Sequence, residues 1–315
     1  MAGHAIGLDI GGTKVAGAVV APDGTVVDEL TEPTPETSDA DTMTRLLLGM
    51  VDTLRDRQPD VVAVGVGAAG TVEWPSGRIL WAPNNEYRDW AIRDELEKAT
   101  GLPAVVDNDA NVAGLAEARL GEVLYKEMVL ITVGTGVGSG IVLDGQIYRG
   151  PRGLGAELGH IIVDPNGPLC GCGNHGCLES LASGTALTRT GREAAAADPD
   201  GAIARLARDK GVEVTGQTVT EAAVAGDPTA RALFADLARW LGVGIASVTT
   251  IFELDAVVIG GGLVDTGELL LGPAREAAAE FAYATQVRPL VPVLPGTFGS
   301  AAGKIGAALL AMECA

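Results

Sequence analysis

Basic side chains are the first thing that this sequence is short of. It holds 22 lysine and arginine residues against 41 aspartate and glutamate residues, which gives a net charge of −19. Nucleic acids and anionic membrane surfaces repel such a chain, so we expect neither as a partner. An anionic substrate would need a local device instead, such as backbone N–H groups or a metal ion.

Long hydrophobic runs are also missing. The longest uncharged stretch, Met128 to Leu143, has 16 residues and is rich in glycine, whereas a membrane span needs about 20 apolar residues. The first residues, M-A-G-H-A-I-G-L-D-I, contain neither a basic region nor a long apolar run, which does not fit a signal peptide. We therefore expect a cytoplasmic protein with no membrane partner.

Cysteine is scarce and unevenly placed. Three of the four cysteines, Cys170, Cys172 and Cys177, stand within one glycine-rich stretch, and three clustered cysteines cannot all pair in disulfides. With one imidazole they predict a closed tetrahedral Cys₃His zinc site of the structural kind. We expect His160 to be the fourth ligand; His175, inside the loop, is the alternative. A catalytic zinc hydrolase is the second interpretation, although it needs an open coordination position and usually fewer sulfurs.

Glycine and apolar side chains are plentiful, since 44 residues are glycine and 47% are hydrophobic. The chain length of 315 residues suits two domains.

A strand, a glycine hairpin and a second strand occur twice, near Asp9 and near Thr132, which indicates an internal structural duplication. Asp89 is a candidate cap for one helix. Apolar runs and helical spacing predict strands over 5–10, 15–21, 25–30, 61–66, 102–106, 128–133, 141–143, 146–148 and 256–259, and helices over 43–54, 91–100, 109–120, 186–197, 202–210, 219–225, 230–252 and 305–312.

Glycine-rich turns each follow a buried strand at three places: Gly11–Gly12, Gly134–Gly140 and Gly260–Gly262. Backbone N–H groups in such turns can cradle phosphates where no basic patch is available. One glycine turn is usually only a hairpin, but three together favour a phosphate site. Asp9, beside the first turn, could hold a magnesium ion through water, and Thr13 and Thr135 could donate hydroxyls to phosphate oxygens.

Asn108 and Asp109 are the other candidates for chemistry. They follow a predicted strand and open a helix, which is where α/β folds place functional residues. A simple helix cap is the alternative, but two such residues, with Asn111 following, exceed what capping needs. An aspartate here can accept the proton of a substrate hydroxyl during phosphoryl transfer.

Taken together, these stretches resemble the ROK family of repressors, open reading frames and sugar kinases, and within it the bacterial glucokinases. The resemblance runs from Ile6 to the C-terminus. It rests on D-I-G-G-T-K at Asp9–Lys14, D-N-D-A-N at Asp107–Asn111, T-V-G-T-G-V-G-S-G at 132–140, E-L-G-H at Glu157–His160, C-G-C-G-N-H-G-C-L-E at Cys170–Glu179 and V-I-G-G-G at Val258–Gly262.

The resemblance implies an α/β fold of the actin/hexokinase (ribonuclease H-like) type, with two domains and a cleft between them. We expect residues 1–110 and a C-terminal helix at 301–315 to form the small domain, and 111–300 to form the large domain with the zinc loop. It also implies phosphoryl transfer from ATP to the 6-hydroxyl of a hexose, most simply glucose. Mg²⁺ would accompany the nucleotide, and Zn²⁺ would be structural.

The same resemblance assigns roles to residues. Asp109 would be the catalytic base. The sugar would be bound by Asn84, Asn108, Asp109, Glu157, His160 and Glu179. The nucleotide would be bound by Asp9, Gly11, Gly12, Thr13, Lys14, Thr135, Gly136, Gly138, Gly260, Gly261 and Gly262. His160 would be shared between sugar and zinc, with Cys170, Cys172 and Cys177 as the other metal ligands.

Three points stay open. The hexose could be mannose, N-acetylmannosamine or fructose, and polyphosphate could serve as a donor besides ATP. The chain could instead be a non-enzymatic ROK regulator that senses sugar. Against this, only eight residues precede Asp9, too few for a helix-turn-helix, and such a sensor would be expected to lack the base or the phosphate motifs. The resemblance further suggests a homodimer or homotetramer.

Overall fold

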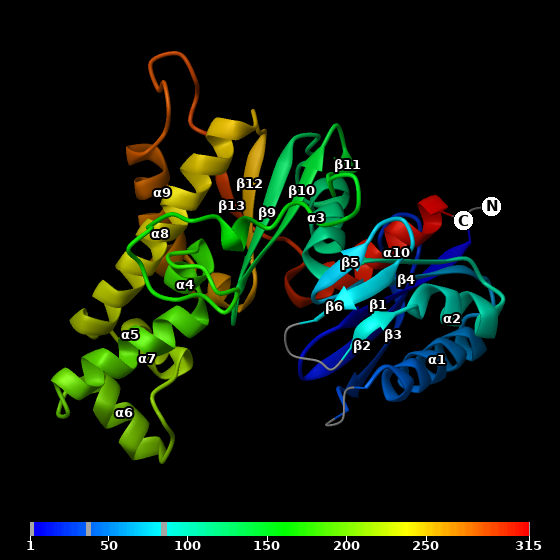
Figure 1. Ribbon diagram of the computed structural model, residues 1–315, viewed down its shortest axis with the longest axis horizontal. Helices are drawn as coiled ribbons and strands as arrows, with labels where there is room; N and C mark the ends of the chain where they lie inside the picture. The colour runs from blue at the N-terminus through cyan, green and yellow to red at the C-terminus, as the bar shows by residue number, and fades with distance from the viewer. Residues whose placement is uncertain (1–2, 36–38, 83–86, 315) are drawn as a thin grey trace. The chain divides into compact units, whose positions relative to one another are not determined.

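The computed structural model describes residues 3–35, 39–82 and 87–314 (Figure 1). By its internal contacts the chain divides into two compact units. The first is Met1–Leu130, Gly140–Ala156 and Thr297–Ala315, and the second is Ile131–Ser139 and Glu157–Gly296. The domain limits expected from the sequence, 1–110 with 301–315 and 111–300, stay a prediction; here 111–130 and 140–156 fall in the first unit.

The strands form two five-stranded sheets of matching order. One is β3-β2-β1-β4-β8, the other is β11-β10-β9-β12-β13, and a small third sheet is β5-β6-β7. Each large sheet is therefore a three-strand meander with two further strands added beside its first strand, which confirms the internal duplication. The strands are β1 (His4–Ile10), β2 (Lys14–Val20), β3 (Val26–Pro33), β4 (Val61–Ala68), β5 (Thr71–Glu73), β6 (Arg78–Trp81), β7 (Arg88–Trp90), β8 (Ala104–Asn108), β9 (Met128–Val133), β10 (Val137–Leu143), β11 (Gln146–Ile147), β12 (Ala256–Gly260) and β13 (Val293–Pro295).

Helices separate and follow these strands, and most of them lie in the second half of the chain (Figure 1). The α-helices are α1 (Ala40–Arg57), α2 (Ile92–Thr100), α3 (Asp109–Leu120), α4 (Leu178–Ala182), α5 (Gly184–Ala197), α6 (Ala202–Lys210), α7 (Gly216–Val224), α8 (Pro228–Ile251), α9 (Glu268–Glu280) and α10 (Ala302–Cys314). Short 3₁₀ turns are η1 (Leu158–His160), η2 (Gly262–Thr266) and η3 (Gly299–Ala301).

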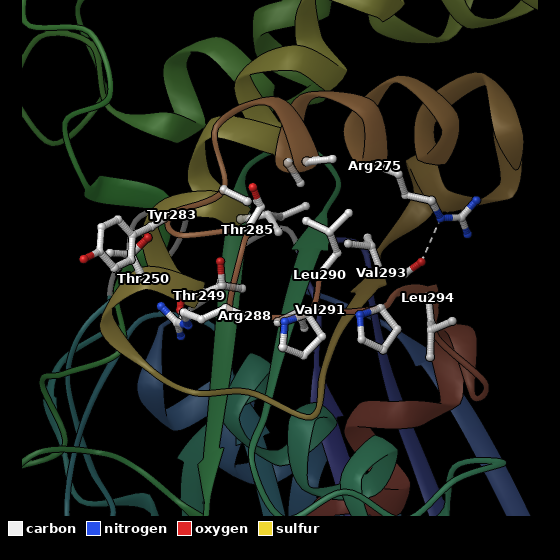
Figure 2. A pocket seen from close by; sticks show the side chains of 16 residues that line it. Thr249, Thr250, Arg275, Tyr283, Thr285, Arg288, Leu290, Val291, Val293 and Leu294 are labelled. Carbon is white, nitrogen blue, oxygen red and sulfur yellow. Dashed lines mark hydrogen bonds between the residues drawn. The ribbon is translucent and has the colours of Figure 1, made fainter.

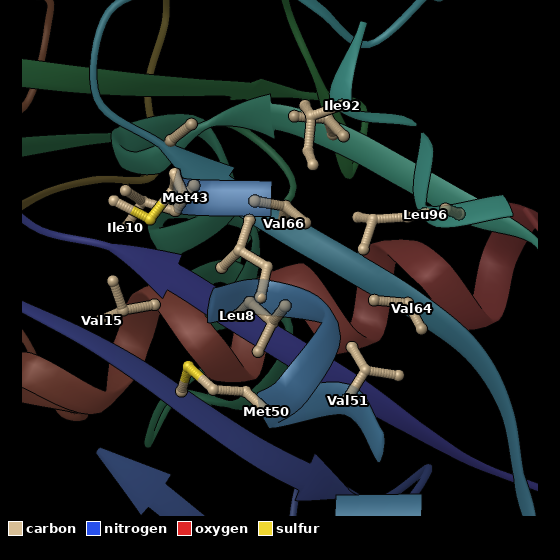
Figure 3. Close-up of a cluster of buried hydrophobic side chains, with 14 of the residues drawn as sticks. Leu8, Ile10, Val15, Met43, Met50, Val51, Val64, Val66, Ile92 and Leu96 are labelled. Atoms are coloured by element: carbon tan, nitrogen blue, oxygen red, sulfur yellow. The ribbon is translucent and has the colours of Figure 1, made fainter. Parts of the chain in front are cut away.

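The first unit has three layers. Alternate side chains of the sheet point to opposite faces, and Leu8 and Ile10 of β1 pack on one face against Met43 and Met50 of α1 (Figure 3). On the other face a second apolar cluster, which includes Ile305, joins the sheet to α3 and α10. Both faces are thus covered, which is why β1 and β4 are buried along almost their whole length.

Glycines allow α10 to lie unusually close to its neighbours. A Cβ atom on Gly7 of β1 would stand 1.8 Å from the carbonyl oxygen of Lys304, and one on Gly65 of β4 would stand 1.9 Å from that of Ala307. On α10 itself, a Cβ on Gly306 would stand 1.7 Å from the carbonyl of Val112 in α3. No side chain fits at these three positions, so the backbones of the helix and the sheet pack directly on each other.

The second unit is built around α8, which packs lengthwise on α9. A Cβ on Gly242 of α8 would stand 2.5 Å from that of Ala277, so these two helices also touch through small residues. Among the described residues, α8 is the single helix whose length and apolar composition would allow it to cross a membrane. However, 56% of its most apolar 18-residue window is buried inside the protein. It therefore has the features of the core helix of a globular unit.

The sequence missed or misplaced several elements. It assigned no element to α9, where Gly272 and Pro273 interrupt the helical signal although Pro273 lies inside the helix. It also missed β5, β6, β7, β13 and α4, each five residues or shorter. Asp89 is wrong as a cap: it lies in β7 with a positive φ of 54°, and the N-cap of α2 is Ala91, which makes no side-chain cap.

Replacing Gly65 by alanine should destabilise the protein, because the new methyl group collides with the backbone of α10 and not with a movable side chain. We expect a loss of about 1–3 kcal/mol or more in urea unfolding. Gly49→Ala is the matched control: Gly49 lies within α1 with nothing within 4 Å of its Cβ position, so alanine should stabilise by about 0.5–1 kcal/mol. Equal stability of Gly65→Ala and wild type would contradict the close packing of α10.

Candidate active site

Strand register in the first unit places the acidic candidates at the carboxyl ends of neighbouring parallel strands. Asp9 on β1 is level with Gly67 on β4, and Gly67 is level with Asp107 on β8, all in parallel strands. Gly67 leaves room for the start of α3, since a Cβ there would stand 3.5 Å from the Cα of Asp109 and closer still to Val112. The carboxyl ends of these strands therefore carry Asp9 and Asp109 together.

Asp9 is a carboxylate in a poorly solvated place. Burial, and next the nearby charge of Asp109, raise its pKa to about 7, against the smaller opposing effect of Lys14 and Lys304. A Cβ on Gly303, in the first turn of α10, would stand 2.6 Å from a carboxylate oxygen of Asp9, so the glycine is what makes space for it. Two carboxylates that repel each other form a site at which a divalent cation is stabilising.

The turn after β1 is closed by its own backbone. The N–H of Gly11 donates to the carbonyl of Lys14 over 3.0 Å, and the hydroxyl of Thr34 donates to the carbonyl of Gly11 over 2.8 Å. Gly12, Thr13 and Lys14 are exposed. This geometry leaves their polar groups accessible at the same edge of the sheet as Asp9.

Asn108 and Asp109 have distinct local functions. Asn108 is the N-cap of α3: its Oδ1 accepts from the N–H groups of Ala110 and Asn111 at 2.9 and 3.2 Å. Its Nδ2 donates to the carbonyl of Gly70 over 3.2 Å, and the same side chain also hydrogen-bonds the Asp109 carboxylate. The capping interpretation thus holds for Asn108, whereas the cap needs nothing from Asp109.

Asp109 presents a desolvated carboxylate. Burial raises its pKa, and hydrogen bonds from the Ala110 N–H and from Asn108 oppose the shift. The Ala110 N–H donates to its Oδ1 over 2.9 Å. A carboxylate whose proton affinity is raised above the ordinary aspartate value is a better general base.

Behind this pair lies a network that the sequence did not indicate. Asp107, 3% exposed, accepts from the Asn108 N–H and from Nδ2 of Asn111 at 2.7 and 2.9 Å. Its other oxygen lies 2.6 Å from Nε of Arg149, whose guanidinium stacks on the ring of Trp74 at 3.8 Å. The ion pair between Asp107 and Arg149 joins β8 to a segment 42 residues away and fixes the turn that presents Asn108 and Asp109.

The glycine turn between β9 and β10, in the second unit, is fixed by hydrogen bonds within itself and to a later segment of the chain. The N–H of Gly134 donates to the carbonyl of Gly136 over 3.0 Å, and the N–H of Gly184 donates to the carbonyl of Gly134 over 2.7 Å. The carboxylate of Glu179 accepts from the N–H of Val137 over 3.1 Å. The predicted glycine run is partly strand, because β10 already begins at Val137 and includes Gly138.

The third glycine turn packs on the second. Gly261 has a positive φ of 82°, and a Cβ there would stand 2.5 Å from the carbonyl oxygen of Val133, the last residue of β9. Close packing is therefore a sufficient reason for glycine at 261. Gly261 and Gly262 are both exposed. Only at Gly262 is the space on the Cβ side also open.

Two sugar-binding candidates of the second unit, Glu157 and His160, lie on a segment that packs against β10. A Cβ on Gly159 would stand 2.1 Å from the carbonyl of Val137, and the N–H of Leu158 donates to the hydroxyl of Ser139 over 3.1 Å. These contacts fix η1, which places Glu157 at its start and His160 at its end. Asn84, the remaining candidate, lies outside the described residues.

The Cys₃His group is brought together as expected. One ligand atom each from His160, Cys170, Cys172 and Cys177 lie within 4.8 Å of one another, while Nδ1 of His175 is 3.1 Å from the carbonyl of Gly167. Tetrahedral zinc with Zn–S bonds of about 2.3 Å would separate two sulfurs by about 3.8 Å. The Cys172 and Cys177 sulfurs are 3.6 Å apart, and Cys170 Sγ is 3.7 Å from Nδ1 of His160, so the donor set fits the ion.

A cavity of about 410 Å³ lies elsewhere in the second unit, between α8, α9 and the loop before β13 (Figure 2). Arg275 donates to the carbonyl of Val293 on its wall over 2.9 Å. Its lining reaches Val293, at the start of β13, which is paired in parallel with Val257 of β12. The glycine turn follows the opposite end of β12, so the cavity is separate from the candidate phosphate site.

Two sheets of the same order, each with a glycine turn after its first strand and candidate functional side chains at strand ends, are typical of the actin/hexokinase-like class of α/β proteins. This is the fold class expected from the sequence, and its solved neighbours confirm it. The ROK family model matches residues 5–314, and the chain belongs to the ROK family.

Relatives with similar sequences include enzymes and regulators. The chain is 39% identical to a glucokinase of Streptomyces coelicolor over 99% of its own length and 98% of the relative's. The solved ROK glucokinase of Streptomyces griseus in complex with glucose and AMPPNP is 40% identical, with a TM-score of 0.87 over 99% of this chain and all of that one. A putative xylose repressor of Caldicellulosiruptor is 35% identical over 73% of this chain and 57% of the repressor.

The pKa of Asp9 gives a prediction about stability. A carboxyl whose folded-state pKa, about 7, exceeds its ordinary value of 3.8 binds its proton more tightly when folded. It therefore contributes stability at low pH that is lost as the pH rises through about 7. Asp9→Asn does not titrate, so its stability relative to wild type should increase by roughly 2–3 kcal/mol between pH 5 and pH 8 without magnesium.

Urea unfolding at several pH values measures this difference. Asp52→Asn is the control, because Asp52 is exposed on α1; its difference from wild type should not grow in the same way. A pH-independent difference for Asp9→Asn would show that Asp9 is not desolvated in the folded protein.

Proposed function

We propose that this protein transfers the γ-phosphoryl group of ATP to the 6-hydroxyl of a hexose, with glucose as the preferred acceptor. The observation that carries the proposal is the desolvated carboxylate of Asp109, held at the start of α3 beside Asp9. A general base and a cation-binding carboxylate at one sheet edge are what phosphoryl transfer to an alcohol requires. Relatives similar over nearly the full length, the glucokinases, support glucose as the acceptor.

Asp109 acts as the general base in this proposal. Its carboxylate accepts the proton of the sugar hydroxyl as the hydroxyl oxygen forms a bond to the γ-phosphorus. The bond from that phosphorus to the bridging oxygen breaks, and ADP leaves with the electron pair. The raised pKa of Asp109 strengthens its affinity for that proton.

Backbone groups and Asp9 take the place of the basic residues that the chain lacks. The N–H groups of Gly12, Thr13, Thr135 and Gly136 would bind phosphate oxygens, while those of Gly11, Gly134 and Val137 are already bonded within and around the turns. Asp9 would hold Mg²⁺ directly or through water, and the ion would neutralise charge on the phosphates. Gly260–Gly262 would lie under the adenosine, and Lys14 would contact the nucleotide.

The hexose would be bound by amide and carboxylate side chains together with one imidazole. Asn108 is held beside Asp109 at the start of α3, and Glu157 and His160 are fixed against β10 by η1. Glu179 and Asn84 complete the proposed set. If Nδ1 of His160 faces the zinc, Nε2 remains for a sugar hydroxyl.

Zinc is proposed as a structural ion held by His160, Cys170, Cys172 and Cys177. Three sulfurs and one nitrogen fill its coordination shell, so it would order the loop and take no part in the reaction. The three thiols of this set and Cys314 are free, and all four lie within the described ranges. Free thiols accord with a reducing compartment, and we propose a cytoplasmic location. We also propose a homodimer or homotetramer.

A sugar-sensing regulator is the second candidate. It is favoured by the xylose repressor to which the chain is 35% identical. A coupled assay of ADP release over glucose, mannose, fructose and N-acetylmannosamine separates the two. Turnover with one of these sugars supports the kinase, and sugar binding without turnover supports the regulator.

Asp109→Asn should lose the base while preserving size and the start of α3. We expect kcat to fall by about 10²–10⁴-fold, and the Kd for glucose, measured by calorimetry, to stay within a few-fold of wild type. Asp52→Asn, on the exposed face of α1, should keep full activity. Turnover of Asp109→Asn within a few-fold of wild type would remove Asp109 from the role of base.

The metal proposal predicts one zinc per chain in the purified protein, measured by elemental analysis. His160→Ala should lower the zinc content and affinity strongly, because one of four ligands is lost. His175→Ala should keep the metal, because its Nδ1 is directed to the carbonyl of Gly167. Zinc lost from His175→Ala but kept by His160→Ala would reverse the choice of ligand.

A further inference from the structure

Glu179 occupies a position between two parts of the second unit. It lies in the first turn of α4, two residues after Cys177. One of its oxygens, Oε2, accepts from the N–H of Val137 over 3.1 Å. The other, Oε1, lies 3.7 Å from the sulfur of Cys170. One partly buried carboxylate thus touches both the candidate phosphate turn and the Cys₃His cluster.

The carboxylate of Glu179 lies close against the turn. A Cβ on Gly136 would stand 2.3 Å from Oε2 of Glu179, so a side chain at 136 would push the carboxylate from its place. A hydrogen bond between a carboxylate and a backbone N–H is stronger than a neutral one, and this one fixes the direction of the peptide that ends the turn.

Two further contacts tie the same segment to the same turn. The N–H of Gly184 donates to the carbonyl of Gly134 over 2.7 Å. Both the N–H and the hydroxyl of Thr185 donate to the carbonyl of Thr135, over 3.2 and 2.8 Å. The segment from Glu179 to Thr185 therefore holds the turn at three of its residues, 134, 135 and 137.

We infer that Glu179 is a positioning residue for the phosphate turn, and that through it the state of the Cys₃His cluster sets the affinity for nucleotide. The inference rests on the proposed function, since it assumes that the turn binds phosphate. A carboxylate that satisfies the Val137 N–H keeps the remaining N–H groups of the turn oriented together. Cys170 and Cys177, on either side of the loop, fix the start of α4 and hence Glu179.

This role differs from a contact with sugar in one measurable respect. A residue that only binds sugar leaves the affinity for nucleotide unchanged when no sugar is present. A residue that shapes the turn changes that affinity without sugar. The side-chain oxygen of glutamine can still accept from the Val137 N–H and carries no charge to repel a phosphate, whereas alanine loses the hydrogen bond.

The experiment is calorimetric titration of the zinc-loaded, full-length protein with Mg²⁺–AMPPNP in the absence of sugar. We expect Glu179→Ala to raise the Kd about tenfold, as the loss of one hydrogen bond to a charged group implies, and Glu179→Gln to stay within about twofold or to bind more tightly. Glu193→Ala is the matched control, because Glu193 is on the solvent side of α5 and pairs only with Arg189 in the described structure. It should not alter the Kd.

Zinc content is measured for every variant, and a second arm tests the cluster. Cys172 is exposed, and its sulfur lies 3.6 Å from that of Cys177 and makes no hydrogen bond to the turn in the described structure. Cys172→Ser, and wild type stripped with a chelator, should weaken AMPPNP binding several-fold without sugar, and zinc returned to the stripped wild type should restore it.

The outcomes separate the inference from the proposed function. Glu179→Ala that retains zinc and binds AMPPNP as wild type does would overturn the positioning role. Zinc-free protein with unchanged AMPPNP affinity would overturn the link to the cluster. Failure of the wild-type protein to bind AMPPNP at all would instead overturn the proposed kinase function.

Discussion

The burial of two neighbouring carboxylates, Asp9 and Asp109, is the constraint on which the first unit depends. Two carboxylates are held near each other where water solvates them poorly, and the pKa of each is raised. Such an arrangement opposes folding at neutral pH, so the surrounding structure must impose it. Parallel register across β1, β4 and β8 does so, and Gly67 and Gly303 leave the space that the two acidic residues need.

The support for this arrangement is mainly backbone packing. Gly7 and Gly65 let α10 lie directly on the sheet, and Gly306 lets α3 lie on α10. Asp107 and Arg149 then fix the turn from β8 into α3 by a buried ion pair. Breaking one partner of such a pair leaves an uncompensated charge, which costs several kcal/mol. The catalytic candidate is thus oriented by residues that do not themselves react.

Much of this was predictable from the sequence because it is local. The strands around Asp9, the helix that opens at Asp109 and the clustering of three cysteines are each carried by a few adjacent residues. The equal order of the two sheets was visible only as a repeated strand and glycine turn. What could not be predicted depends on pairs distant in sequence: Arg149 reaches Asp107, and Glu179 reaches Val137.

Local signals also misled where tertiary structure decides. Pro273 suppressed the prediction of α9, yet the helix passes through it because its apolar face packs on α8. The positive φ of Gly261 and its contact with Val133 already demand glycine there, so the glycine by itself is no evidence for or against the predicted nucleotide contact. A glycine motif therefore records backbone geometry first, and ligand binding only where the N–H groups remain open.

The shortage of basic residues explains why the proposed phosphate site depends on rigid backbone turns. The net charge of −19 produces a long-range field that opposes the approach of the negatively charged nucleotide. The free energy of binding must therefore come from short-range, oriented groups. Backbone N–H groups supply it only if the turns that carry them are held rigid. In the second unit that rigidity comes from the segment between Glu179 and Thr185, and this segment begins where the cysteine loop ends. A structural zinc, as proposed for this loop, would therefore affect phosphate binding without taking part in the reaction, because it would order the residues that order the turn.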